Sequence, residues 1–130
     1  MAEAPRRAIL AAITCAAALS GCSGSKSPTA PSGPVVTTTT ITITAAGVSP
    51  KDIQIALGNR VLFINNDTKT HEMGSDPHPE HTDCPFINQV GFLQPGERRE
   101  TGNSVVARIC GFHDHENPDS QNLRGTITTK

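Results

Sequence analysis

The sequence predicts an all-β protein, a single small β-sandwich that follows an N-terminal export segment and a flexible tether. Three observations support this fold class. β-Branched and apolar residues alternate with polar ones over several short stretches, Gly and Pro separate those stretches, and no window beyond the N-terminal segment has a helical period. Five or more short strands joined by Gly/Pro turns are typical of a sandwich.

The folded domain is expected to span residues 37–130. Its most apolar stretch, residues 60–65, is expected to be a central strand. Residues 73–89 have no clear period and are predicted to form a long loop, a feature that is often functional in compact domains. The predicted strands are, in order, residues 37–44, 52–57, 60–65, 101–109 and 123–129.

Composition limits the core and the function. The chain has no Trp, no Tyr and four Phe, so the core must be built mainly from Val, Ile and Leu. A net charge of -1 gives no electrostatic reason to expect a nucleic-acid partner. No nucleophile–base motif is evident, so an enzyme is not expected. The protein is expected to be a monomer.

The first 21 residues are predicted to be a signal peptide that ends in a lipobox. Arg6 and Arg7 precede an apolar run over residues 8–19, which is too short to span a bilayer comfortably. Residues 19–22 read Leu-Ser-Gly-Cys, which resembles the lipobox of bacterial lipoproteins. That resemblance implies that Cys22 is acylated and becomes the new N-terminus.

Residues 22–36 are predicted to be a flexible tether, because Ser, Pro, Gly and Ala cannot bury enough apolar surface to fold. The protein is therefore expected to be exported and lipid-anchored at the bacterial cell envelope, in the periplasm or on the outer surface, with the membrane as one partner. Cys15 leaves with the signal peptide and Cys22 carries lipid. Two cysteines, Cys84 and Cys110, then remain in the domain.

All five histidines fall in two segments outside the predicted strands, and they are His71, His78, His81, His113 and His115. Imidazole is the commonest protein metal ligand at neutral pH. Cys110 and His113 are three residues apart, a spacing at which a tight turn aims both at one ion, and thiolate beside imidazole favours copper or zinc. His71 follows the central strand and is expected to join them.

The sequence resembles the cupredoxin family, the plastocyanin- and azurin-like blue copper proteins. The residues that carry the resemblance are Val48 to Pro50, Ile53, Ile55, Gly58, Val61, Phe63, Asn65, Asp67 and His71, then Leu93 to Glu97, Ile109 to His113, and Gly125 to Thr128. The resemblance implies a Greek-key sandwich with one copper ion at one end, held by His71, Cys110 and His113, and a role in one-electron transfer. The electron-transfer or copper-handling partner protein is unknown.

The axial position and the fate of Cys110 leave alternatives open. Leu123 stands where the family usually has Met and cannot ligate, so His115 or Glu116 is a candidate replacement. Two cysteines alone in an exported domain commonly form a disulfide, and a Cys84–Cys110 bridge would stabilise the fold by roughly 3 kcal/mol. That bridge would leave an imidazole-only copper or zinc site, formed by His71 with His113 or His115, and with His78 or His81 as further candidates.

The loop histidines His78 and His81 are expected to be solvated, with a metal-capture or supporting role as alternatives. Three functions follow for the domain. The first is a blue copper electron carrier with a reduced Cys110. The second is a copper-binding or storage module with the disulfide and a His-only site, and the third is a metal-free degenerate cupredoxin fold.

Overall fold

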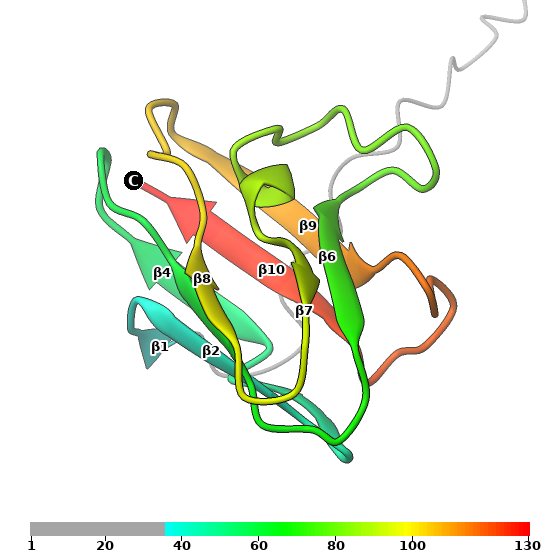
Figure 1. Cartoon of the computed structure of the whole chain (residues 1–130). Helices are drawn as coiled ribbons and strands as arrows, with labels where there is room; N and C mark the ends of the chain where they lie inside the picture. Colours follow the sequence, from blue (N-terminus) through cyan, green and yellow to red (C-terminus); the bar gives the residue numbers. More distant parts are fainter. Residues whose placement is uncertain (1–35) are drawn as a thin grey trace, which may run out of the picture.

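Two mixed β-sheets packed face to face form the domain (Figure 1). The structure is a computed structural model that describes residues 36–130. Within these residues the larger sheet has six strands, in the order β1 (Val36–Thr37), β4 (Asp52–Ile55), β10 (Arg124–Thr129), β9 (Arg108–Asp114), β6 (His71–Ser75) and β7 (Gly91–Leu93). The smaller sheet of this region has four, in the order β3 (Gly47–Ser49), β2 (Thr40–Thr44), β5 (Leu62–Asn65) and β8 (Arg98–Glu100).

The predicted all-β sandwich is confirmed. In β2 the Ile residues are buried and the Thr residues are half-buried, as period-two alternation requires. Strand β5 lies between β2 and β8, so the most apolar stretch is an inner strand, as predicted. Gly58 has a φ of 83°, a left-handed conformation that suits glycine, and it makes the turn after β4.

The core between the sheets is aliphatic apart from three Phe rings and the sulfur atoms. Phe63 of β5 and Phe112 of β9 pack edge-on across the two sheets, with ring centroids 5.3 Å apart. Both rings are fully buried, as are Ile41, Ile53 and Ile127. Truncation of either ring to Ala would cost about 3–5 kcal/mol. The hydrophobic core is thus formed by apolar side chains from both sheets.

One predicted strand is wrong. Residues 101–109 do not form a strand as a whole, and β9 begins at Arg108 and continues to Asp114. Val105 and Val106, which lie within this predicted strand, are 75% and 58% exposed in a loop. Two polar residues of this loop are buried instead, since Thr101 accepts a hydrogen bond from the Val61 N–H and the hydroxyl of Ser104 bonds that of Thr129. The strand prediction failed here because β-branched residues also occur at exposed loop positions.

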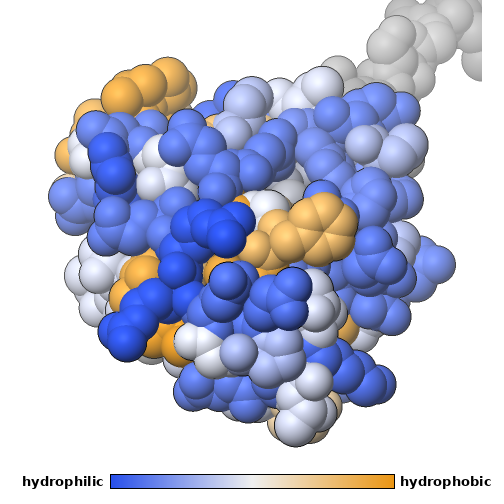
Figure 2. Space-filling view, in the orientation of Figure 1, coloured by the Kyte–Doolittle hydropathy of each residue, from blue (hydrophilic) through white to orange (hydrophobic). Residues whose placement is uncertain are grey.

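The face of the molecule seen in Figure 2 is mainly hydrophilic, with hydrophobic residues in separate patches. No helix in the described part of the chain is long and apolar enough to cross a membrane. The predicted signal peptide, Cys22 and all of the predicted tether but its last residue lie outside the described residues. A 3-10 turn, η1 (Ile87–Gln89), completes the domain and follows the loop that carries His78 and His81.

Candidate metal centre

The two faces of β9 have different roles. Phe112 faces the second sheet, where its ring contacts Phe63. Because side chains alternate along a strand, Cys110 and Asp114 share that inner face, whereas Gly111 and His113 lie on the outer face of the six-stranded sheet. His113 is nonetheless only 1% exposed. A loop must therefore cover the outer face of the sheet at this point.

Two glycines leave the sheet backbone bare beside His113. Gly74 of β6 pairs with His113 in the strand register, and Gly111 lies two residues before His113 on the same face. A Cβ atom on Gly74 would lie 2.9 Å from the His81 ring, and one on Gly111 would collide with the carboxylate of Asp76. The loop of residues 76–83 consequently packs directly on the backbone of two strands.

Local hydrogen bonds fix the shape of this loop. The His81 N–H donates to the Pro77 carbonyl at 2.7 Å, which closes a turn. The Asn88 side chain donates to the His81 carbonyl and accepts the Ser75 N–H, both at 2.8 Å. His81 has a φ of 52°, a left-handed conformation that non-glycine residues seldom adopt. The backbone of His81 is thus held at both its N–H and its carbonyl, with its ring laid over Gly74.

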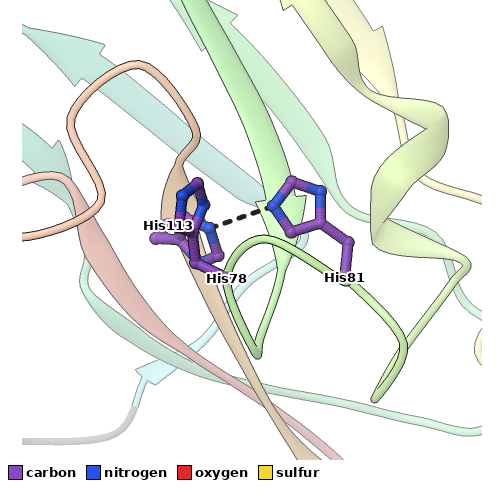
Figure 3. A group of neighbouring side chains, drawn as sticks. All are labelled: His78, His81 and His113. Carbon is purple, nitrogen blue, oxygen red and sulfur yellow. Dashed lines mark hydrogen bonds between the residues drawn. The ribbon is translucent and has the colours of Figure 1, made fainter.

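Four imidazoles meet on this outer face. Nε2 of His81 lies 3.2 Å from Nε2 of His113 and 3.2 Å from Nδ1 of His115. The His78 ring is centred 5.4 Å from that of His113 and 4.8 Å from that of His115. Figure 3 shows the His81 ring pointing from its loop toward His78 and His113. One ring nitrogen from each of these three residues lies within 4.8 Å of the other two.

The spacing and chemistry of these nitrogens suit a transition metal. Two nitrogens bound at 2.0–2.1 Å to a tetrahedral ion are about 3.3 Å apart, and the His81–His113 nitrogens are separated by 3.2 Å. Neutral imidazole supplies a lone pair, and an all-imidazole donor set fits copper or zinc. His78 is exposed and His115 is half-buried, so the group is open to an ion from solvent.

Asp76 determines which nitrogen of His113 is available. Its Oδ1 accepts a hydrogen bond from Nδ1 of His113 at 2.7 Å, so the lone pair of the neutral ring is on Nε2, which faces His81. Burial lowers the pKa of His81, and the neighbouring His113, His115 and His78 lower it further, against an opposing effect of Asp76. His81 is therefore neutral at neutral pH, which is the form that binds metals.

Cys84 and Cys110 form a disulfide, with Cα atoms 5.9 Å apart, so this predicted alternative is the one present. Both residues are buried. Because a disulfide-bonded cysteine has no thiolate, the prediction that Cys110 supplies a thiolate ligand is wrong for this oxidised state. The strand also continues beyond Phe112, whereas the prediction placed Cys110 and His113 on one tight turn.

His71 is not part of the imidazole group. It begins β6 on the inner face, and its Nδ1 and Nε2 lie 2.9 Å and 3.1 Å from carboxylate oxygens of Asp114 and Asp67. Cys110 precedes Asp114 by four residues of extended strand, which span about 13 Å. The structure therefore does not bring His71, Cys110 and His113 together, and both His71 nitrogens already have partners.

Comparison with known structures identifies the fold. A purple cupredoxin from Nitrosopumilus maritimus superposes with a TM-score of 0.56 at 19% identity, over 72% of this chain and 100% of that one. Oxidized plastocyanin from Dryopteris crassirhizoma superposes with a TM-score of 0.54 at 17% identity, over 70% of this chain and 99% of that one. The domain has a cupredoxin fold. A copper-containing nitrite reductase from Thermus scotoductus also matches, with a TM-score of 0.54 at 20% identity. The match covers 70% of this chain but only 22% of the reductase chain.

These likenesses show the cupredoxin fold and no more than the fold. No known family model matches the sequence, and no curated protein matches it either. In this cupredoxin domain, His113 and His115 are the two predicted ligands that lie in the imidazole group. His78 and His81, which were expected to be solvated, complete it.

The other predicted positions are arranged differently. Leu123 is half-buried against the core of the cupredoxin domain, and Glu116 is exposed. Two histidines also proved to lie in strands, His71 in β6 and His113 in β9, although all five were predicted in loops. Sequence reasoning missed Asp76. The signal that could have indicated the covered face is a glycine within each strand, since such a residue marks a close approach of other groups.

Proposed function

We propose that the domain binds one copper ion through His78, His81 and His113, with His115 as a fourth nitrogen ligand. The observation that carries the proposal is the convergence of the first three ring nitrogens within 4.8 Å of one another. Copper is preferred to zinc because divalent copper binds nitrogen sites more tightly than zinc does. A bound ion would supply one-electron redox chemistry, and this chain's residues supply the ligands and their orientation.

The disulfide makes an imidazole-only copper-binding module the better-supported role. A blue copper centre requires a thiolate, and Cys110 is bonded to Cys84. One-electron transfer is the second candidate, favoured by the burial of His113 and its 2.7 Å bond to Asp76, which keep one ligand fixed. Rigid ligands keep the reorganisation energy small when a bound ion gains or loses an electron. Cyclic voltammetry of the copper-loaded protein distinguishes a reversible couple from a centre that only stores the ion.

We also propose the cellular context that the sequence predicts. The protein is exported and anchored through lipid on Cys22, with residues 22–36 as a tether and residues 37–130 as the working domain. In this setting it acts as a monomer that exchanges copper or electrons with a partner protein of the envelope. Mass spectrometry of the membrane fraction, before and after Cys22→Ala, tests the anchor.

Copper(II) titration followed by electron paramagnetic resonance tests the main proposal. We expect one copper per chain, nitrogen hyperfine structure, and no intense visible band. His81→Ala and His113→Ala should each weaken binding by more than about 100-fold, beyond the usual effect of losing a supporting residue. Glu80→Gln, at an exposed position of the same loop, is the matched control. Unchanged affinity in His113→Ala would refute the assignment.

A further inference from the structure

The disulfide joins the two segments that carry the imidazoles. Cys84 lies three residues after His81, and Cys110 lies three residues before His113. Both half-cystines are buried, at 1% and 0% exposure. The covalent bond therefore links the histidine-bearing loop to the strand that it covers, at a point that solvent does not reach.

The loop is held on both faces of the sheet near the end of β6. On the outer face, the His81 ring packs over Gly74. On the inner face, the Cys84 N–H donates to Oγ of Ser75 at 3.4 Å, and Cys84 is bonded to Cys110. The chain between His81 and Cys84 consequently passes around the end of the strand. The inner attachment resists any outward movement of the loop that would separate His81 from His113.

We propose, on the basis of the copper site proposed above, that the Cys84–Cys110 disulfide sets the metal affinity of the imidazole group by holding His78 and His81 against His113. Reduction by a dithiol supplies two electrons and two protons, converts the bridge to two thiols, and leaves the reductant as a disulfide. The loop then loses its covalent attachment on the inner face, and the metal is bound more weakly. A reducing partner would thereby release copper from this domain.

Reduction does not convert the site into a thiolate–copper centre. Cys110 and His113 are three positions apart in one continuous strand, and an odd difference in position puts their side chains on opposite faces of the sheet. The Cys110 sulfur lies on the side of Phe112 in the core, whereas the imidazoles lie on the solvent side. The thiol of a reduced Cys110 therefore cannot reach an ion held by His81 and His113 while β9 stays paired with β10.

Cys84→Ser tests both parts of the inference, because it breaks the bridge and leaves one Cys110 thiol. Zinc and copper affinities are measured for the wild type, Cys84→Ser and Cys84→Ser/Cys110→Ser, with folding checked by circular dichroism. We expect both variants to bind about tenfold more weakly, within the usual range of coupling between sites. Neither copper complex should have an intense visible band. Affinity within threefold of the wild type, or an intense band in Cys84→Ser alone, would overturn the inference.

A measurement on the wild-type protein keeps the inference testable if these variants do not fold. Coupling is reciprocal, so bound metal must stabilise the disulfide by the same factor by which the disulfide strengthens metal binding. The protein is equilibrated in thiol–disulfide redox buffers with and without saturating free zinc, which is not itself reduced. A tenfold coupling lowers the disulfide potential by about 30 mV. An unchanged potential in zinc-bound protein rejects the inference, whereas absence of metal binding by the wild type rejects the proposed function instead.

Discussion

Oδ1 of Asp76 lies 2.7 Å from Nδ1 of His113, and this bond orients a ring whose other nitrogen faces His81. A carboxylate behind a histidine ligand fixes its tautomer and raises its basicity. The carboxylate is also 3.6 Å from Arg124, which compensates its charge. The arrangement gives a direct test of the imidazole group that leaves every proposed ligand in place.

Asp76→Ala should weaken copper binding by about 10- to 100-fold, the usual effect of losing such a supporting residue. Asp76→Asn should retain more affinity, because its amide oxygen still accepts the His113 N–H. Isothermal titration with copper and with zinc measures both, and Glu80→Gln again serves as control. Equal affinity in Asp76→Ala and the wild type would show that the carboxylate does not position His113.

Gly74→Ala should impair the metal site while the sandwich stays folded. Its added Cβ would lie 2.9 Å from two atoms of the His81 ring, so the ring must move away from His113. We expect copper affinity to fall by about tenfold, as for a lost supporting group. Glu72→Ala, on the same strand and face, is the comparison variant. If Gly74→Ala bound copper as the wild type does, the loop would not be seated on β6 as described.

His71→Ala should lower the free energy of unfolding by about 2 kcal/mol, because it removes one hydrogen bond to the buried carboxylate of Asp114, which keeps its bonds from Asn117 and the Glu72 N–H. It should leave copper stoichiometry unchanged, since His71 is bonded to Asp114 and Asp67 rather than placed among the other imidazoles. Urea denaturation and copper titration give the two readings, with the exposed Lys69→Ala as control. Loss of copper without loss of stability would make His71 a ligand.

Stability of the metal-free protein should fall in acid. Burial opposes ionisation of Asp114, but bonds from His71, Asn117 and the Glu72 N–H outweigh it and lower its pKa below 3.8. The Thr68 N–H and His71 likewise lower the pKa of Asp67. A carboxyl group whose pKa is lowered in the folded state stabilises the protein at pH values above its unfolded-state pKa. This stabilisation is lost as the pH falls through the folded-state pKa. Urea midpoints should therefore drop below about pH 4, in addition to a decline below pH 6.5 from His81, whose pKa is also lowered in the folded state. The drop below about pH 4 should be less steep in Asp114→Asn.

The strands were predictable because their alternation reflects burial directly. Ile41 and Ile43 face the core and their Thr neighbours do not, so the pattern alone locates β2. The valines at 105 and 106 show the limit of this reasoning, since β-branched residues also occur on exposed loops. The resemblance of the sequence to cupredoxins correctly indicated a sandwich of two β-sheets.

The site was only partly predictable, because it depends on strand parity and loop placement. Cys110 and His113 could belong to one site only if the chain turned between them. The strand instead continues from Arg108 to Asp114, so the two side chains lie on opposite faces of the sheet. His78 and His81 gave no periodic signal, and their position follows from contacts of the loop with Gly74 and Asn88. The disulfide was one of two explicit alternatives, and sequence alone gave no reason to exclude the thiolate.

The bare backbone at Gly74 and Gly111 leaves room for the four imidazoles of the metal site on the outer face of the six-stranded sheet, outside the sandwich. Phe63 and Phe112 are fully buried in the core between the sheets, on the opposite face of the six-stranded sheet from these imidazoles. The order of assembly follows from this placement. Under the proposed function, the chain can finish folding and oxidise its cysteines before it acquires copper.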